Sequence, residues 1–542
     1  MNWLLALIAL VSAFSAASAS NFLVISPVFG YSHMKFMNKV ADTLANGGHN
    51  VTVLQIYNYE HFGTIRMAKN KKVEIIDYHD KENAPSNENS ASAFKYMWNT
   101  EVINNPISGA IATATVLFKE MEPMCAKILN DKELHQWILS KKFDGYISET
   151  FDFCGLFLGD HLKLNLLPMY SSTKILPSVY AIGETSVLNF LPSMRTNYGE
   201  NQTMFDRVND IISFHCLEVA FARLFEKQYD QAMGLLNGDV RHWKHILRTA
   251  TYFFSNSNDY VAFPTPSLPK HIHVGGFTID PPKNLQLDEE YDKILSLRKS
   301  TVLISFGTVI QSADMPDTFK NGIVKMFHSL PEITFIWKYE VDDESLSKRI
   351  PSNVILKKWV PQPALLADKR LKLFITHGGL GSTLEVAYSG MPALMIPVFG
   401  DQLLNAKMLS RHGGAKVFDK YDLEDAGKLK EAIEEVISNE SFKANAVLTA
   451  EYLKNQPIDP KMNLLRHMEF TAKFGRVPAL EPYNINYSFI QYYMLDAACL
   501  LLSVALLILY IVHLIVKFIY RRVMIRFQGK LDSKSKSKSK SE

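Results

Sequence analysis

The chain has 542 residues, of which 47% are hydrophobic, and its 58 lysines and arginines against 55 aspartates and glutamates leave a formal net charge of +3. This length predicts more than one domain, and the apolar fraction is large enough for buried cores. The near balance of charge gives no support for nucleic acid as a partner. The basic excess is concentrated in the last residues, at Lys530, Lys534, Lys536, Lys538 and Lys540.

Residues 1–19 have the pattern of a secretory signal peptide. An apolar run from Trp3 to Phe14 precedes Ala17-Ser18-Ala19, which has the small-x-small form of a cleavage site. The basic residues that usually precede such a run are missing, apart from the α-amino group, so an uncleaved anchor is the alternative.

The first half of the chain begins as a β-α-β unit. Asn21 to Ser26 is a short apolar strand, Met34 to Leu44 has helical spacing and Asn50 to Ile56 is another strand, which together predict a parallel sheet. Tyr78 to Ser92 is polar and predicts a loop. Ile147 to Leu158 is expected to close a strand and open a helix.

Ser186 to Phe225 has helical spacing and is rich in large apolar residues. Three interpretations are open for it: it lines a ligand pocket, it lies on a membrane, or it is an ordinary core helix. Tyr260 to Pro269 then carries three prolines and predicts a linker between two domains.

The second half restarts the α/β pattern. Thr301 to Phe306 is a predicted strand, Thr318 to Leu330 a helix, and Ile333 to Trp337 and Val354 to Val360 are two more strands. The sequence therefore predicts a second α/β domain.

The stretch from Phe374 to Gln402 carries the strongest functional pattern. A predicted strand, Leu371 to Thr376, leads through a turn with three glycines, residues 377–381, into a helix from about Ser382 to Tyr388. Glycines let the backbone approach an anion, and the unpaired N–H groups of a helix start face it, so this is a phosphate site. The next strand, Ala393 to Val398, places Asp401 and Gln402 at its carboxyl end, where open α/β sheets bind ligands. The helix after it is predicted over Gln402 to Ser410.

The C-terminal region predicts one membrane crossing. Ala497 to Val516 is apolar apart from His513, which is long enough to span a bilayer, and the basic residues after it are expected to stay in the cytosol. Lys538 and Lys540 fit a dilysine retrieval signal of endoplasmic-reticulum membrane proteins, and a solvated Lys-Ser tail is the alternative.

Cysteines and glycosylation motifs fit a luminal body. Cys499 lies in the predicted anchor, so Cys125, Cys154 and Cys216 allow at most one luminal disulfide. Acceptor motifs for N-glycosylation stand at Asn50, Asn201, Asn439 and Asn486.

The chain resembles the UDP-glycosyltransferase family, whose membrane-bound members conjugate small lipophilic molecules. The resemblance rests on His377-Gly378-Gly379, Glu385, Gly390-Met391-Pro392, Pro397 and Asp401-Gln402, and extends to the signal segment, His33, the linker and the anchor. It implies an α/β fold of the GT-B type, with two Rossmann-like domains facing a cleft. The expected order is an acceptor domain over residues 20–259, a linker over 260–275, a UDP-sugar domain over 276–490, the transmembrane helix over 497–516 and a cytosolic tail over 517–542. A helix from Asp459 to Phe474 is expected to cross back onto the first domain.

The resemblance implies that His33 is the base that deprotonates the acceptor, a task suited to a histidine of near-neutral pKa. Its partner in the family is an aspartate five residues before a cysteine. Glu149 stands at that spacing from Cys154, so Glu149 is the favoured partner and Asp152 the second candidate.

The donor site is likewise implied by the resemblance. His377 and the Gly378–Gly379 backbone are expected on the diphosphate with Ser382 and Thr308, Trp359 on the uracil with Gln362 and backbone groups, and Glu385 on the ribose. Asp401 and Gln402 are expected to bind the hydroxyl groups of the sugar. The alternatives in which these residues have only a structural role are a Ser382–Glu385 capping box, a core position for Trp359, and a helix N-cap for Asp401. The expected donor-site residues are Thr308, Trp359, Val360, Gln362, His377, Gly378, Gly379, Ser382, Glu385, Asp401 and Gln402.

The expected reaction is transfer of a hexose from a UDP-sugar to a hydroxyl, with inversion and with neither a metal nor another cofactor. Glucuronosyl relatives carry arginines where Asn256 and Thr265 stand, which favours a neutral sugar, glucose, over glucuronate. A nicotinamide oxidoreductase is the rival enzyme, but Leu384 replaces the third glycine of its fingerprint. An inactive lipophile binder of the same fold is the rival outside catalysis. The acceptor is not identified, and a homo-oligomer stays open.

Overall fold

The computed structural model describes residues 19–57, 66–79, 95–99, 106–173, 176–184, 202–281 and 285–538. Nearly all of the predicted signal peptide, most of the predicted loop after Tyr78, the sequon at Asn201 and the first part of the predicted 186–225 helix lie outside these residues. The chain forms two compact units, which meet between Glu481 and Pro482.

The first sheet has seven parallel strands in the order β3-β2-β1-β4-β5-β6-β7. Its central strands are buried along their length, as expected for a parallel sheet covered on both faces. The strand β7 falls inside the range predicted as a linker, and completes the sheet instead. The strands are β1 (Asn21–Val28), β2 (Asn50–Tyr57), β3 (Glu74–Tyr78), β4 (Gly145–Glu149), β5 (Leu166–Tyr170), β6 (Phe253–Ser255) and β7 (His271–His273).

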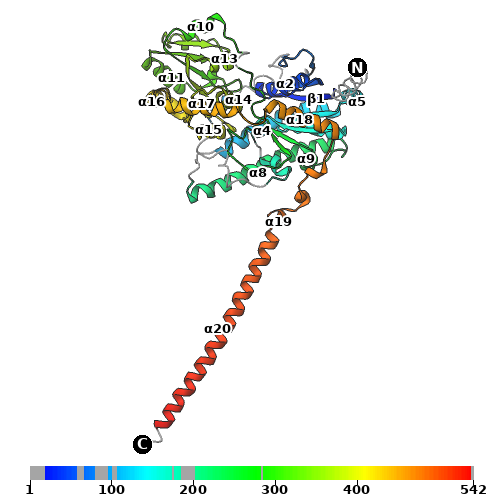
Figure 1. The fold of residues 1–542 in the computed structure, drawn as a ribbon, viewed down its shortest axis with the longest axis vertical. Coiled ribbons are helices and arrows are strands. Elements are labelled where there is room, and N and C mark those ends of the chain that lie inside the picture. The colour runs from blue at the N-terminus through cyan, green and yellow to red at the C-terminus, as the bar shows by residue number, and fades with distance from the viewer. Residues whose placement is uncertain are drawn as a thin grey trace, which may run out of the picture. The chain divides into compact units, whose positions relative to one another are not determined.

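Helices cover both faces of this sheet (Figure 1). One apolar cluster packs β1, β2 and β4 against α4, α5, α6, α8 and α9, and a second packs the other face against α2. The helices are α2 (Tyr31–Asn46), α4 (Pro106–Asn130), α5 (Lys132–Ser140), α6 (Cys154–His161), α7 (Leu176–Ala181), α8 (Met204–Leu235) and α9 (Trp243–Thr249).

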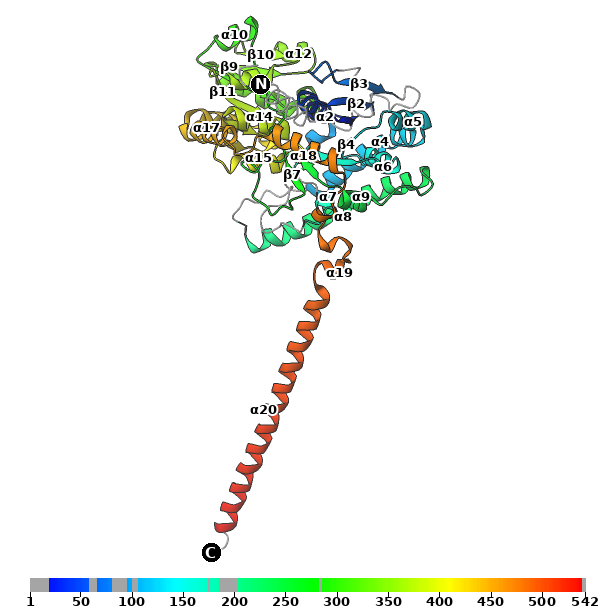
Figure 2. The ribbon, with the colours of Figure 1, turned by 45° about the vertical axis from the view of Figure 1, so that its right-hand side comes forward.

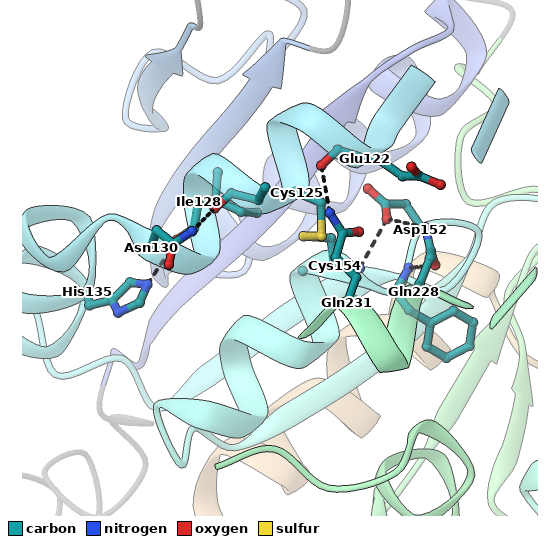
Figure 3. Close-up of a disulfide and its surroundings, with 12 residues drawn as sticks. Glu122, Cys125, Ile128, Asn130, His135, Asp152, Cys154, Gln228 and Gln231 are labelled. Atoms are coloured by element: carbon teal, nitrogen blue, oxygen red, sulfur yellow. Dashed lines mark hydrogen bonds between the residues drawn. A yellow bond between two sulfur atoms is a disulfide. The ribbon is translucent and has the colours of Figure 1, made fainter. Parts of the chain in front are cut away.

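A disulfide ties two of these helices together. Cys125 of α4 and Cys154 of α6 are bonded, whereas Cys216 and Cys499 are free. The same region is held by Gln228 of α8, whose side chain accepts from the Phe153 N–H and donates to Asp152, as Figure 3 shows. The single disulfide agrees with the count allowed by the sequence.

The second sheet has six parallel strands in the order β10-β9-β8-β11-β12-β13. Two strands end earlier than predicted, β10 at Lys357 and β12 at Met395, because the chain there turns toward prolines, which cannot donate to a ladder. The strands are β8 (Ser300–Ser305), β9 (Ile333–Lys338), β10 (Val354–Lys357), β11 (Leu371–Thr376), β12 (Ala393–Met395) and β13 (Ala415–Val417).

Helices again pack on both faces of this sheet, over two separate apolar clusters. They are α10 (Glu289–Leu295), α11 (Asp317–Ser329), α12 (Glu344–Ser347), α13 (Gln362–Ala367), α14 (Leu380–Ser389), α15 (Gln402–Ser410), α16 (Ala426–Ser438) and α17 (Glu440–Lys454).

The helix α18 (Pro460–Phe474) returns to the first sheet, as the sequence predicts. Leu464 and Met468 are fully buried in the cluster that contains Phe36 and Val40 of α2. The Asn463 side chain also donates to a carbonyl of β7. The helix α18 therefore fastens the second domain to the first.

The second unit contains α19 (Phe489–Tyr492) and α20 (Leu495–Lys538), drawn in orange and red in Figure 2. Within α20, residues 495–533 are long and apolar enough to cross a membrane, and an 18-residue stretch within them has a mean hydropathy of 2.9. The predicted span, 497–516, lies inside this helix.

Candidate active site

A cleft of about 890 Å³ lies between the two sheets. Its walls come from the turns that follow β1, β5 and β6 on one side and β8, β9, β11 and β12 on the other. These turns all stand at carboxyl ends of parallel strands, the edge at which such sheets bind ligands. The cleft is therefore where both predicted half-sites meet.

His33 lies in the first turn of α2, directly after β1, and its side chain is 20% exposed to the cleft. Its Nδ1 is 2.8 Å from Oε1 of Glu149, the last residue of β4, whose side chain is fully buried. A carboxylate on Nδ1 favours the tautomer that leaves Nε2 without a proton. The pair therefore has the arrangement of a general base and its orienting group.

Ser171, which follows β5, is a third member of this group. Its Oγ is 2.9 Å from His33 Nδ1 and donates to Glu149 Oε1, to which its N–H also donates at 3.3 Å. The other Glu149 oxygen has no hydrogen-bond partner among the described residues. Oε1 is thus the atom that holds the base in place.

Asp152 has a different environment from Glu149. Its Oδ1 accepts from the Cys154 N–H at 3.0 Å and from Gln228 at 3.3 Å. Burial raises the pKa of the Asp152 carboxyl to about 6, and the charge of Glu149 adds to the shift. The structure brings Glu149 to His33, and it places Asp152 at the start of α6.

His377 directly follows β11 and lies on the opposite wall of the cleft. Burial lowers the pKa of its imidazole to about 4, and Lys338 adds to the shift, so the ring is neutral near pH 7 and can donate one hydrogen bond. Gly307 allows the close approach of the two turns: its φ is +89°, and a Cβ there would lie 2.7 Å from the imidazole. Gly378 and Gly379 then lead into α14.

The helix α14 begins at Leu380 with Gly379 as its N-cap, and no side chain caps it. The alternative of a Ser382–Glu385 capping box is therefore wrong. Gln362 instead donates to both residues, at 3.1 Å to Ser382 Oγ and at 2.7 Å to Glu385 Oε2. The other Glu385 oxygen pairs at 2.9 Å with Lys35, which comes from α2 across the cleft.

Trp359 is 55% exposed, so the alternative of a core position for it is wrong. Its indole lines the cleft, with its centroid 5.5 Å from that of Tyr31 and 5.8 Å from Nζ of Lys338. Val360 beside it is buried, and Thr308 lines the cleft from the turn after β8. An exposed indole over a cleft offers a flat surface for a base.

Asp401 occupies the N-cap position of α15 without capping it, so that alternative is also wrong. Its carboxylate accepts from the Ser172 hydroxyl, which stands on the first domain. The Gln402 side-chain oxygen accepts from the Val398 and Phe399 N–H groups at 2.8 and 3.0 Å. Gln402 thus holds the turn from which Asp401 faces the cleft.

A sequence profile described as "UDP-glucoronosyl and UDP-glucosyl transferase" matches residues 21–530. The chain belongs to this family. The Caenorhabditis elegans protein ugt-56 is 28% identical over 485 residues, which are 87% of this chain and 88% of that protein. UDP-glucuronosyltransferase 2B17 of Mus musculus is 25% identical over 500 residues, 91% of this chain and 92% of that protein.

Solved glycosyltransferases share the fold of this UDP-glycosyltransferase. Os79 from O. sativa has a TM-score of 0.56 at 15% identity and covers 83% of this chain and 99% of its own. A UDP-glucosyltransferase from Polygonum tinctorium has a TM-score of 0.54 at 15% identity, over 85% and 100% of the two chains. The GT-B fold of two Rossmann-like domains is thereby confirmed, as is the predicted family.

Four residues of this UDP-glycosyltransferase cleft were not predicted from the sequence. Lys338 follows the predicted strand Ile333 to Trp337, so the rule that ligands bind at the carboxyl ends of parallel strands could have found it. Ser171 and Ser172 follow β5, a strand that was not predicted. Lys35 lies two residues after His33 on α2 and carried no signal. Within the described part of the chain, no three His, Cys, Asp or Glu side chains form a group that could hold a metal ion.

Proposed function

We propose that this UDP-glycosyltransferase transfers a hexose, glucose first of all, from a UDP-sugar to a hydroxyl of a small lipophilic acceptor. One observation carries the proposal. The His33–Glu149 pair stands on one wall of the cleft, and the anion site formed by His377, Gly379 and the start of α14 stands on the other. A base and a pyrophosphate site that share one cavity suit a direct displacement.

In the proposed reaction, Nε2 of His33 removes the proton of the acceptor hydroxyl. The resulting oxygen attacks the anomeric carbon, the bond from that carbon to the UDP oxygen breaks, and UDP leaves with the electron pair. Attack from the face opposite to UDP inverts the configuration and gives a β-glycoside. Glu149 stabilises the imidazolium that forms, and the N–H groups at the start of α14 together with His377 stabilise the departing diphosphate.

The remaining donor contacts follow from the positions in the cleft. The exposed Trp359 indole supports stacking on uracil, and Glu385 is proposed to take the ribose hydroxyls in exchange for Lys35. Asp401 is proposed to bind the sugar hydroxyls, because its carboxylate already accepts a hydrogen bond from the Ser172 hydroxyl in the cleft. Thr308 and Ser382 supply hydroxyls near the diphosphate.

The charges of the cleft favour a neutral sugar. Asn256 is buried beside the base, where its side chain donates to the Ser171 carbonyl at 2.9 Å. The described cations that line the cleft already have partners: Lys35 pairs with Glu385, Lys39 and Lys69 with Asp280, Lys338 with Glu340, and Arg66 with two backbone carbonyls. A uronate carboxylate would have to displace one of these pairs.

UDP-glucuronate is the second candidate donor, since relatives such as the Mus musculus protein are named UDP-glucuronosyltransferases. The acceptor end is apolar and aromatic, which fits a lipophilic alcohol or phenol. Phe29 lies 4.2 Å from His33 between ring centroids, and Phe151, Leu217 and Phe221 line the same region.

The apolar α20 supports a membrane-anchored enzyme. We further propose the endoplasmic reticulum membrane, with a luminal catalytic body and a cytosolic tail. The Cys125–Cys154 disulfide fits an oxidising compartment on the side of the body.

The test is UDP release by membranes that carry the full chain, screened against phenols, steroids, bile acids and lipids with UDP-glucose and UDP-glucuronate in parallel. Release that depends on an acceptor, is faster with UDP-glucose and is absent in His33→Ala is the expected result. A clear preference for UDP-glucuronate would reverse the choice of sugar. Binding of UDP without any acceptor-dependent release would favour the inactive lipophile binder.

A further inference from the structure

The helix α8 is apolar on two opposite faces. Its inner face contacts α4, α6, α7 and α9, and Phe214, Leu217 and Phe225 are buried on this face. Its outer face, here called the α8 stripe, carries large apolar side chains that are 47–79% exposed: Met204, Phe205, Val208, Ile211, Ile212 and Val219. A surface helix of a soluble protein normally presents a polar face to water.

The α8 stripe follows one side of the helix, with the exposed His215 as a polar position between Ile212 and Val219. Met204, Val208, Ile212 and Val219 recur at spacings of four and seven residues, and at 3.6 residues per turn these positions share one side. The first half of α8 thus exposes one apolar strip, and the helix runs along the outer edge of the described part of the body (Figures 1 and 2). Scattered exposed apolar residues need no explanation, but a strip of this kind marks an interaction surface.

The charges around the stripe indicate the kind of partner. Arg207 and Arg223 are exposed near its two ends, while the acidic Glu218 is half-buried and bonded to His215. Asp206 is used at the start of the helix, where it bonds to Thr203. An apolar strip with arginines at its ends is the pattern of a helix that lies in the interface of a bilayer.

We infer that the α8 stripe lies on the membrane surface and that the bilayer is its partner. The inference rests on the proposed anchoring through α20. Residues 482–494 join the body to this helix and reach at most about 45 Å when fully extended. A bilayer is then always within reach of the body, so a contact of a few side chains can be populated without high intrinsic affinity.

The inner face of α8 gives this contact a function. Leu217 and Phe221 line the acceptor end of the cleft, on the side of the helix that faces away from the stripe. With the stripe on the bilayer, α8 alone separates the acceptor region from the hydrocarbon. A lipophilic acceptor dissolved in the membrane can then enter the cleft beside this helix without crossing bulk water.

Cys216 offers a direct probe, because it is exposed on α8 between Ile212 and Val219. The full chain with Cys499→Ser is labelled at Cys216 with an environment-sensitive fluorophore and reconstituted in phosphatidylcholine vesicles with or without nitroxide lipids. The matched control carries the label at Tyr452→Cys, an equally exposed position on α17, in a Cys216→Ser, Cys499→Ser background. The expected result is quenching of the Cys216 label by at least about twofold and none of the control. Equal quenching at both sites, or none at Cys216, would overturn the inference.

A second experiment separates the stripe from the anchor. A protease site placed within residues 482–494 releases the body after reconstitution, and vesicle flotation before cleavage checks that the full chain is attached to the membrane. After cleavage, the wild-type body should stay on the vesicles, Val208→Ser/Ile212→Ser/Val219→Ser should leave them, and Val447→Ser/Leu448→Ser/Tyr452→Ser should stay. Release of the wild-type body contradicts the inference, and failure of the uncleaved chain to float contradicts the anchor and the inference together.

Cross-linking of Cys216 between two copies would show a second copy on the stripe and would also overturn the inference. UDP release with a water-soluble phenol in detergent tests catalysis separately and should not change in either triple variant.

Discussion

Replacement of Glu149 by glutamine is the sharpest test of the proposed base. The amide keeps the volume of the side chain but removes the charge that faces His33 Nδ1 at 2.8 Å. The Glu149 side chain is fully buried, so water cannot replace that charge when the imidazolium forms. The loss should therefore appear in the chemical step and not in the binding of the donor.

The geometry sets the size of the effect. Two unit charges 2.8 Å apart attract by about 6 kcal/mol at an effective dielectric constant of roughly 20, which is an upper bound. Removal of one partner from a buried pair costs about 3–5 kcal/mol in measured cases. At about 1.4 kcal/mol for each factor of ten, kcat should fall by roughly 10²- to 10⁴-fold.

The assay is UDP release under saturating donor and acceptor, with the thermal unfolding midpoint as a check on folding. Asp152→Asn is the matched control, because Asp152 is a neighbouring, partly buried carboxylate that only accepts hydrogen bonds, which an amide oxygen can also accept. It should keep kcat within about threefold. If Glu149→Gln keeps activity within threefold, or if Asp152→Asn falls as far, the assignment of the partner of His33 is wrong.

Three further predictions concern the donor wall and the frame of the first domain. Gly307→Ala should raise the KM for the UDP-sugar about tenfold or more, because its Cβ would lie 2.7 Å from the His377 ring. His377→Gln should make the free energy of unfolding less sensitive to acid. The pKa of His377 is about 4 in the folded protein and 6.5 in the unfolded chain, so the unfolded chain binds the proton first as pH falls. Between pH 6.5 and 4, the wild type should therefore lose about 2–3 kcal/mol of unfolding free energy relative to the variant, measured by urea unfolding. Cys125→Ala/Cys154→Ala should lower the free energy of unfolding by about 3–4 kcal/mol, the loop entropy expected for a sequence separation of 29, measured in the same way.

Matched controls exist for each of these changes. Gly381→Ala adds a Cβ that meets nothing within 4 Å, so donor KM should change little, and an equal rise in both glycine variants would mean that His377 is not the obstacle. If the difference in unfolding free energy between wild type and His377→Gln does not change with pH, the imidazole is not held neutral in the folded protein. Cys216→Ala removes a free, exposed cysteine and should leave the stability unchanged.

Long apolar runs made most of the second domain predictable. The strands β9 and β11 and the helix α15 begin where the sequence predicts, because buried parallel strands leave clear apolar runs and α15 is buried on nearly every side. The strand β7 was missed inside the predicted linker. Three residues are too few to show a period, and its place in the sheet depends on pairing with β6.

The pattern Ser382-x-x-Glu385 suggested a capping box that the structure does not contain, and the reason is physical. A capping box needs Ser382 just before the first turn of the helix, but the glycines allow α14 to start two residues earlier, at Leu380. Ser382 and Glu385 are then free to face Gln362 and the cleft. The functional interpretation and the capping interpretation use the same residues, and only the observed start of the helix separates them.

Contacts across the cleft could not be predicted from the sequence. Lys35 and Glu385 are 350 positions apart, and Ser172 and Asp401 are 229 apart. Neither pair follows from the pattern of its own domain, because both depend on how α18 and the linker dock the two sheets. In the proposed donor complex, Glu385 would exchange its contact with Lys35 for the ribose hydroxyls.

The glutamate at position 149 illustrates how one substitution is absorbed by its neighbours. An aspartate at the end of β4 would place its carboxylate one methylene further from His33, so the glutamate reaches Nδ1 at 2.8 Å only because a neighbouring residue fixes its longer, more mobile side chain. Ser171 does so from the next strand, since both its N–H and its hydroxyl donate to the same Oε1. The backbone carbonyl of Ser171 is in turn held by Asn256. The base and Asn256 are therefore joined through one serine, and a change at Asn256 can reach the His33–Glu149 pair through Ser171.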